Sequence, residues 1–363
     1  MIFDRKEISE MLKKLKEIGS PRMTDQEQGV LAKGHLLIAN NLKMALTVEI
    51  EEDIDEPFVI PIKAIDYIAS LPDAKVDISC KDNFVTVKGN GRKSRFATLP
   101  TDLFPDLELA TMKNSKDVLE ISKDENILSA LKTVSFACSK DEASVYSGVK
   151  LEGTNKELSL VACDGYRLAV YKYERDAEGV DMIVPSAAIK TLLNVADEDF
   201  PVFFKTMNDK KDRIVIKASE YTIYASSPTS GKFIEYKSAF PNKINAMFTV
   251  NKHELLSTIN RGIICRGSEK GFVAVLEAVK DANSLTVRSS NSVTDFNELV
   301  SIAKTDIESD VKMGFDLKYM AEALKAINED DVMITYVNPT APLSMFAGHL
   351  SQIILPMRLK EGA

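Results

Sequence analysis

The sequence predicts an α+β fold in which one structural plan is repeated three times along 363 residues. Three observations support this prediction. Two kinds of segment each recur three times, short alternating apolar runs fill the space between them, and the chain is too long for one ordinary core. With 45% hydrophobic and 28% charged residues, the composition is typical of a soluble globular protein.

The first recurring segment begins near residues 1, 118 and 247. In each copy, a few alternating apolar residues lead to a polar residue suited to cap a helix, namely Asp4, Ser122 and Asn251. Apolar residues then return every three or four positions. A short strand followed by an amphipathic helix is therefore predicted in each copy.

The second recurring segment begins near residues 58, 182 and 313. Each copy predicts a strand, a helix that opens at Pro61, Pro185 or Asp316, a turn and another strand. This gives six helices, two in each repeat, and further strands elsewhere, with "KGNG" at 88 to 91 as a hairpin turn. The predicted domains are residues 1–117, 118–245 and 246–363.

The charge and the hydropathy pattern exclude some classes of protein. A net charge of −8 and a pI near 5.2 argue against a chain that coats nucleic acid with its whole surface, but they allow a local basic surface. The first residues do not resemble a signal peptide, and no apolar run approaches the length of a membrane span. A cytoplasmic location is expected.

Signals of a catalytic or metal site are nearly absent. The four cysteines and three histidines are scattered, and the common phosphate-binding, zinc-protease and hydrolase motifs do not occur. We therefore expect neither an enzyme nor a cofactor. The acid, phenol and guanidinium of Asp164, Tyr166 and Arg167 leave an unrecognised catalytic site open as an alternative.

Basic residues recur on the polar side of the predicted helices. If equivalent helices face one common surface, these residues would hold phosphates without reading bases. The candidates are Lys13, Lys14, Lys16, Lys63, Lys132, Lys190, Arg261, Lys318 and Lys325.

Three stretches carry a specific resemblance to a known family. They are "LVACDGYRLAV" at 160 to 170, "TLPTDLFPDLEL" at 98 to 109 and "ILPMRL" at 354 to 359. Together with the three repeats, they resemble the bacterial sliding clamp, the beta subunit of DNA polymerase III, over the whole chain. The resemblance implies three clamp domains per chain and a head-to-tail homodimeric ring around duplex DNA. Helices would line the hole, sheets would lie outside, and the ring would have no catalytic activity.

The same resemblance implies the partners. An ATP-dependent loader would open the ring, and the polymerase alpha subunit, other polymerases and repair enzymes would insert tail peptides into a hydrophobic pocket. No cofactor, metal or membrane is implied. A diverged clamp-fold adaptor that docks peptides without ring loading is the alternative.

Residue by residue, the resemblance implies two further sites. At the ring interface, Phe104 would meet Ile264 and Cys265 of the second copy. Cys163, Tyr166 and Ile234 replace residue types usual in the family, so a different peptide preference is expected. The implied pocket residues are Tyr146, Cys163, Gly165, Tyr166, Arg167, Leu168, Ile234, Ser238, Ala239, Pro342, Ile353, Leu355, Pro356, Met357 and Arg358.

Overall fold

A computed structural model describes residues 1–18, 29–104, 115–122, 126–197, 199–207, 213–228, 231–266, 273–280, 282–290 and 293–359. Within these residues the protein has six α-helices and 22 strands, which form three antiparallel sheets. This confirms the predicted α+β class and the six helices. The second half of the "TLPTDLFPDLEL" stretch, from residue 105 onward, lies outside the described residues.

The chain divides into two compact units. The first contains Met1–Leu128 and Ala187–Ser227, and the second contains Ser129–Ser186 and Pro228–Ala363. This division follows the sheets and not the three expected repeats. Strand β3 pairs with β14 from Tyr221↔Val48 to Ala225↔Met44, so strands of the first and second repeats share one sheet.

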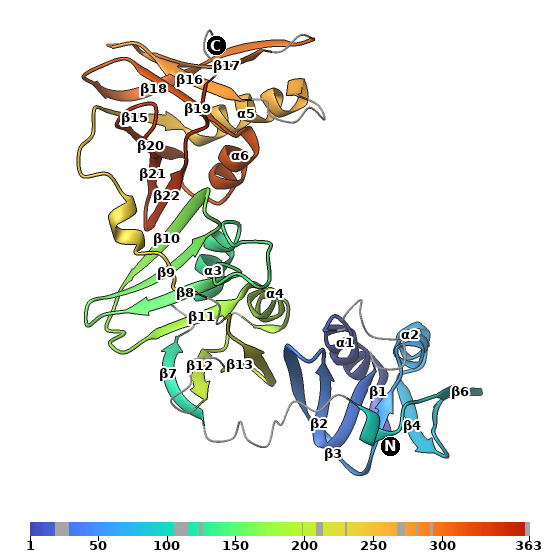
Figure 1. Cartoon of the computed structure of the whole chain (residues 1–363). Helices are drawn as coiled ribbons and strands as arrows, with labels where there is room; N and C mark the ends of the chain where they lie inside the picture. The colour runs from blue at the N-terminus through green and yellow to red at the C-terminus, as the bar shows by residue number, and fades with distance from the viewer. Residues whose placement is uncertain are drawn as a thin grey trace. The chain divides into compact units, whose positions relative to one another are not determined.

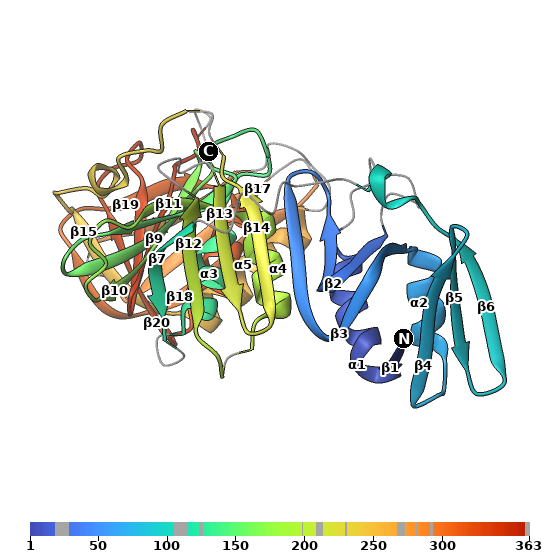
Figure 2. The same cartoon turned by 90° about the horizontal axis from the view of Figure 1, so that it is seen from below.

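The first unit contains a four-stranded sheet, β1-β4-β5-β6, and a six-stranded sheet, β2-β3-β14-β13-β12-β7. Helices α1 and α2 lie side by side against these strands (Figure 2). The elements are β1 (Ile2–Asp4), α1 (Arg5–Lys16), β2 (Val30–Asn40), β3 (Met44–Ile60), α2 (Ile62–Ser70), β4 (Lys75–Lys81), β5 (Phe84–Gly89), β6 (Arg92–Ala97), β7 (Ser115–Ile121), α4 (Ser186–Val195), β12 (Val202–Met207), β13 (Arg213–Ala218) and β14 (Tyr221–Ser226).

The second unit is organised by one twelve-stranded sheet, β11-β8-β9-β10-β22-β21-β20-β15-β18-β17-β16-β19 (Figure 1). Its elements are α3 (Ile127–Ser135), β8 (Gly148–Gly153), β9 (Glu157–Cys163), β10 (Arg167–Glu174), β11 (Asp181–Pro185), β15 (Ala246–Asn251), α5 (Lys252–Arg266), β16 (Ala274–Ala278), β17 (Ser284–Ser290), β18 (Asp295–Ile307), β19 (Val311–Phe315), α6 (Leu317–Lys325), β20 (Asp331–Tyr336), β21 (Leu343–Ala347) and β22 (Leu350–Ile354).

Most of the predicted helix starts are confirmed. The carboxylates of Asp4 and Asp316 and the amide oxygen of Asn251 each accept a hydrogen bond from a backbone N–H in the first turn of the following helix. Helices α2 and α4 begin directly after Pro61 and Pro185.

The expectation that Ser122 caps the third helix is wrong, because α3 begins only at Ile127. The residue before it, Asn126, has a φ of +43°, a left-handed conformation that a continuous right-handed helix cannot contain. The expected hairpin is confirmed. Gly91 has a φ of +69° in the turn that joins β5 to β6, where Gly89 and Arg92 are paired.

An ion pair on β16 and β17 predicts how stability depends on pH. Glu277 accepts two hydrogen bonds from the Arg288 guanidinium, at 2.7 and 2.8 Å, and these bonds hold the pKa of the Glu277 carboxyl below its usual value. A carboxyl with a lowered pKa in the folded state stabilises the fold above its unfolded-state pKa. That contribution is lost as the pH falls through the folded-state pKa.

We therefore expect Glu277→Gln to lower the free energy of unfolding by about 1 kcal/mol at pH 7 and by much less near pH 3. Urea unfolding at both pH values measures this difference. Glu308→Gln, at an exposed position, is the control. An equal loss at both pH values would contradict the assigned ion pair.

Candidate functional site

The side chain of Asp164 fixes the turn between β9 and β10. Its Oδ1 accepts hydrogen bonds from the backbone N–H groups of Tyr166 at 2.9 Å and Arg167 at 3.0 Å. Gly165 has a φ of +89°, in the left-handed region that favours glycine. Aspartate and glycine are used here as chain-reversal residues. The interpretation of Asp164 and Gly165 as a turn that presents the following residues is confirmed.

The guanidinium of Arg167 is buried among partners from its own chain. Its Nε donates to Asp164 Oδ2 at 3.0 Å, and its Nη1 donates to Glu322 on α6. The rings of Phe136 and Tyr319 lie 5.1 and 4.6 Å from the guanidinium carbon. A buried cation is tolerated only when anions and aromatic faces replace water in this way. Arg167 therefore joins the β9–β10 turn to helix α6.

Strand β10 pairs with β22, so the sheet of β8 to β11 continues into that of β15 to β22. Leu168 and Ile353 are direct partners across this pair and place their side chains on the same face. The backbone N–H of Leu355 donates to the carbonyl of Tyr166 at 2.9 Å and extends the contact. Residues predicted for opposite walls of one pocket are thus brought side by side.

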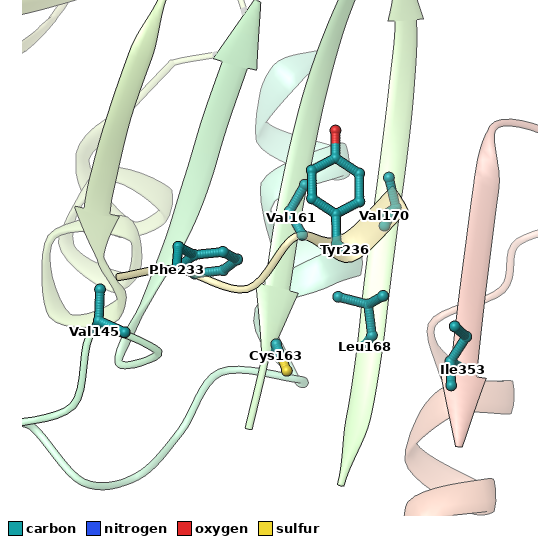
Figure 3. Packing of buried hydrophobic residues seen from close by; sticks show 8 residues of the cluster. All are labelled: Val145, Val161, Cys163, Leu168, Val170, Phe233, Tyr236 and Ile353. Atoms are coloured by element: carbon teal, nitrogen blue, oxygen red, sulfur yellow. The ribbon is translucent and has the colours of Figure 1, made fainter. Parts of the chain in front are cut away.

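Residues 231–241, which we call the crossing segment, run over this face of the sheet. Phe233 and Tyr236 point from it toward β9 and β10 (Figure 3). The Tyr236 hydroxyl donates to Glu152 at 2.9 Å, which fixes the segment at its polar end. The buried cluster consists of Val145, Val161, Cys163, Leu168, Val170, Phe233, Tyr236 and Ile353.

Sequence reasoning placed Ile234, Ser238 and Ala239 on the crossing segment but missed Phe233 and Tyr236, which anchor it. Two aromatic residues three positions apart in "GKFIEYKS", where Ile234 is the only other apolar side chain, were the available signal. Without the neighbouring strands, nothing in that spacing indicated which surface they would cover.

Apolar side chains remain exposed around the buried cluster. Tyr166 is 61% exposed and stacks on Tyr319 with ring centroids 6.1 Å apart, and Ile234 and Leu355 are each 40% exposed. Tyr146 is partly buried and packs edge-on against Phe233 at 5.2 Å. We call the docking surface the set Tyr146, Gly165, Tyr166, Ile234, Ser238, Ala239, Pro342, Leu355, Pro356, Met357 and Arg358.

The remaining implied pocket residues, Cys163, Arg167, Leu168 and Ile353, lie beneath this surface, each no more than 6% exposed. Pro342 directly precedes β21, whose Leu343 pairs with Ile354, so it lies at the same end of these strands as Leu355.

Burial raises the pKa of the Cys163 thiol and raises that of Cys138 to about 12. Both thiols therefore stay protonated at neutral pH and are poor nucleophiles.

The nine candidate phosphate-holding residues do not share one environment. Lys13, Lys63, Lys132, Lys190, Lys318 and Lys325 are exposed on their helices. Lys14 lies over the Tyr221 ring at 4.9 Å, and Lys16 pairs with Asp66 at 2.5 Å. Arg261 is held by the Glu298 carboxylate through both oxygens, and this pairing lowers the pKa of Glu298. The first six are therefore the freer cations of the set.

The candidate interface residues differ in exposure. Ile264 is 77% exposed at the end of α5, and Cys265 beside it is partly buried. Phe104 is only 6% exposed within its own chain, while its neighbour Leu103 is 61% exposed. The apolar surface near Phe104 is thus provided mainly by Leu103.

Two hollows in the first unit have acidic linings. One of about 150 Å³ is lined partly by Asp4, Glu7, Glu49, Glu51 and Glu52. Another of about 620 Å³ is lined partly by Glu10, Asp197, Asp199 and Glu220. Their carboxylates would repel phosphate groups, so neither suits nucleic acid.

No helix in the described part of the chain is both long and apolar enough to cross a membrane. Across the described ranges, no group of three or more His, Cys, Asp or Glu residues is arranged to hold a metal ion.

Two comparisons by sequence point to one family. Residues 121–232 match the family model of the DNA polymerase III beta subunit, central domain, and residues 237–358 match that of its C-terminal domain. The beta sliding clamp of Staphylococcus epidermidis is 24% identical over 352 residues, covering 89% of this chain and 88% of that protein. The beta sliding clamp of Staphylococcus aureus is 23% identical over 351 residues, covering 90% of each.

Solved structures share the fold. The sliding clamp of Bacillus subtilis aligns with a TM-score of 0.87 at 19% identity, over 99% of both chains. The beta subunit of Thermotoga maritima aligns with a TM-score of 0.86 at 20% identity, also over 99% of both chains. Because the two family models together match more than half of the chain, it belongs to the DNA polymerase III beta subunit family, the non-catalytic beta sliding clamps.

Proposed function

We propose that two copies of this chain close head to tail into a ring around duplex DNA and tether DNA polymerases through the docking surface. In this proposal each chain contributes three clamp domains, with joins near residues 117 and 245. The family models, which match 121–232 and 237–358, support these joins. The observation that carries the proposal is a pair of open strand edges with opposite charge.

The first open edge is β6, the last strand of the four-stranded sheet. It pairs only with β5 in the described chain and carries Arg92, Lys93 and Arg95. An exposed edge presents unpaired N–H and C=O groups and is a template for pairing with another chain. Its positive charge favours an acidic partner strand.

The second open edge is the first half of β18. From Asp295 to Ser301 this strand pairs with β17, and its pairing with β15 begins only at Ile302. The Ser301 N–H already donates to Glu254 on α5 at 2.9 Å, so the open stretch is Asp295 to Val300. It carries Asp295, and Leu299 on it is 67% exposed. Pairing β6 of one copy with β18 of the second would satisfy both edges and bring opposite charges together.

Pairing of this kind uses different surfaces on the two copies. Such a head-to-tail contact closes into a ring when the rotation between copies permits it. Exposed Leu103 and Ile264 would supply apolar contact beside the paired strands. A monomer would favour the alternative, a clamp-fold adaptor that docks peptides without being loaded on DNA.

The exposed lysines support a role in holding DNA without reading its sequence. Lysine on a helix surface contacts phosphates as a flexible point charge, and such contacts are independent of base sequence. The overall charge of −8 would limit binding to the helix faces that carry these lysines. An ATP-dependent loader would place the ring on DNA, and the alpha subunit and other polymerases or repair enzymes would dock by tail peptides.

The docking surface supports such a peptide role. Exposed Tyr166, Ile234 and Leu355 offer apolar area around a buried cluster, and Met357 offers adaptable contact. A polar rim is provided by Ser238 and Arg358, which are exposed. This combination suits a short peptide with apolar side chains.

We expect loaded protein to remain on closed circular DNA and to be lost when the circle is cut, because a ring is retained by topology and not by affinity. The loader from the same organism would load labelled protein on nicked plasmid, and gel filtration after restriction cleavage would measure retention. Equal retention on linear and circular DNA would refute the ring.

We expect Ile264→Glu to convert the dimer into a monomer, because the new charge would be buried at the contact between copies. The fold of the single chain should tolerate the change, because Ile264 is exposed there. Light scattering at micromolar concentration measures the size. Phe200→Glu, at a position 50% exposed in the first unit, is the control. A dimer that survives Ile264→Glu would place the contact elsewhere.

Deleting residues from Leu355 onward should abolish binding of a polymerase tail peptide and leave the dimer intact, because the deletion removes one side of the docking surface only. A chain that ends after Leu359 serves as the control. Fluorescence anisotropy with a labelled peptide from the alpha subunit tail measures binding. Unchanged affinity would show that the peptide binds elsewhere.

A further inference from the structure

The segment after β22 is held at two points on different strands. Leu355 N–H donates to the carbonyl of Tyr166 beside β10, and two residues later Met357 N–H donates to the carbonyl of Gly314 in β19 at 2.8 Å. Between them Pro356 has no N–H to contribute. These two backbone bonds set the position of the segment 355–359, which we call the tail.

Gly314 leaves no room for a side chain because the tail lies directly against it. A Cβ at this position would lie 2.4 Å from Met357 O, 2.8 Å from Leu359 Cδ2 and 2.9 Å from Val273 Cγ1. The φ of Gly314 is not in the left-handed region, so alanine would fit the backbone itself. The requirement for glycine is therefore steric and comes mainly from the tail, with the Val273 side chain as the third contact.

If a side chain were added at Gly314, the tail would move and β19 would stay in place. β19 pairs with β16 at five successive positions, and Met313 and Phe315 on either side of Gly314 are each 1% exposed. Moving the strand would disrupt this core, whereas moving the tail strains mainly the hydrogen bond at Met357. Relief of the 2.4 Å contact requires a displacement of about 1 Å.

We propose that Gly314 is a positioning residue that sets where the tail side of the docking surface stands, and thereby the affinity for partner peptides. It acts through Met357 and Leu355 and does not itself touch the peptide. The proposal rests on the docking function proposed above. It assigns a role to a residue that lies outside the docking surface, on the edge strand β19 of the same sheet.

The test is Gly314→Ala in the full chain, with a labelled alpha subunit tail peptide as the probe. We expect the peptide to bind about tenfold more weakly, the effect of removing one well-packed contact from an interface. Dimer size and retention on circular DNA should be unchanged. Affinity within twofold of the natural chain, in a folded variant, would overturn the proposal.

Gly29→Ala is the matched control, because a Cβ there would also meet backbone, at 2.9 Å from Ile60 O, but in the first unit. It should lower thermal stability without changing peptide affinity. If both variants weaken binding equally, the effect is general destabilisation and the proposal fails. If the natural chain does not bind the peptide, the docking function itself is refuted.

A second pair of variants, made in the tail, tests the hydrogen bond from Met357 N–H to the Gly314 carbonyl. Met357→Pro removes the N–H that donates to Gly314, and Met357→Leu keeps that N–H with an apolar side chain of similar size. Both lack methionine, and they differ in the backbone N–H and in the proline ring, which fixes φ at this position. We expect the proline variant to bind the peptide about tenfold more weakly than the leucine variant. Equal affinities would overturn the proposal even if Gly314→Ala does not fold.

Discussion

The pairing of β10 with β22 is the interaction on which the rest of the second unit depends. It joins strands from the middle of the chain to the last strand and places Leu168 beside Ile353. The docking surface spans this pair, the crossing segment packs over it, and the tail follows directly from β22. A sheet fixes register strongly when one face is buried, so these residues meet in a single arrangement.

The ion pairs of Arg167 add to the contacts that the strands make. Arg167 sits at the first position of β10 and connects Asp164 to Glu322, so the turn and helix α6 are held to the same strand. Replacing one partner would leave a buried charge unpaired, which is far more costly than losing an exposed ion pair. Asp164 and Arg167, which the sequence left open as catalytic residues, thus hold the turn and helix α6 in position.

Sequence patterns predicted the elements better than the contacts between them. Caps at Asp4 and Asp316 were recognisable because capping depends on neighbours within one turn. The start of α3 was missed because the positive φ of Asn126 leaves no periodic signal. The sequence identified many candidate pocket residues through resemblance, but the anchoring by Phe233 and Tyr236 and the steric need for Gly314 depend on distant strands.

The order of synthesis adds a consequence of the β10–β22 pair. Its partners are about 180 residues apart, and β22 is synthesised long after β10. A growing chain can fold its first unit while β10 still presents an unpaired edge. The proposed contact with polymerases would therefore be unavailable to incomplete chains, so truncated products of translation would not compete with finished clamps for the replication machinery.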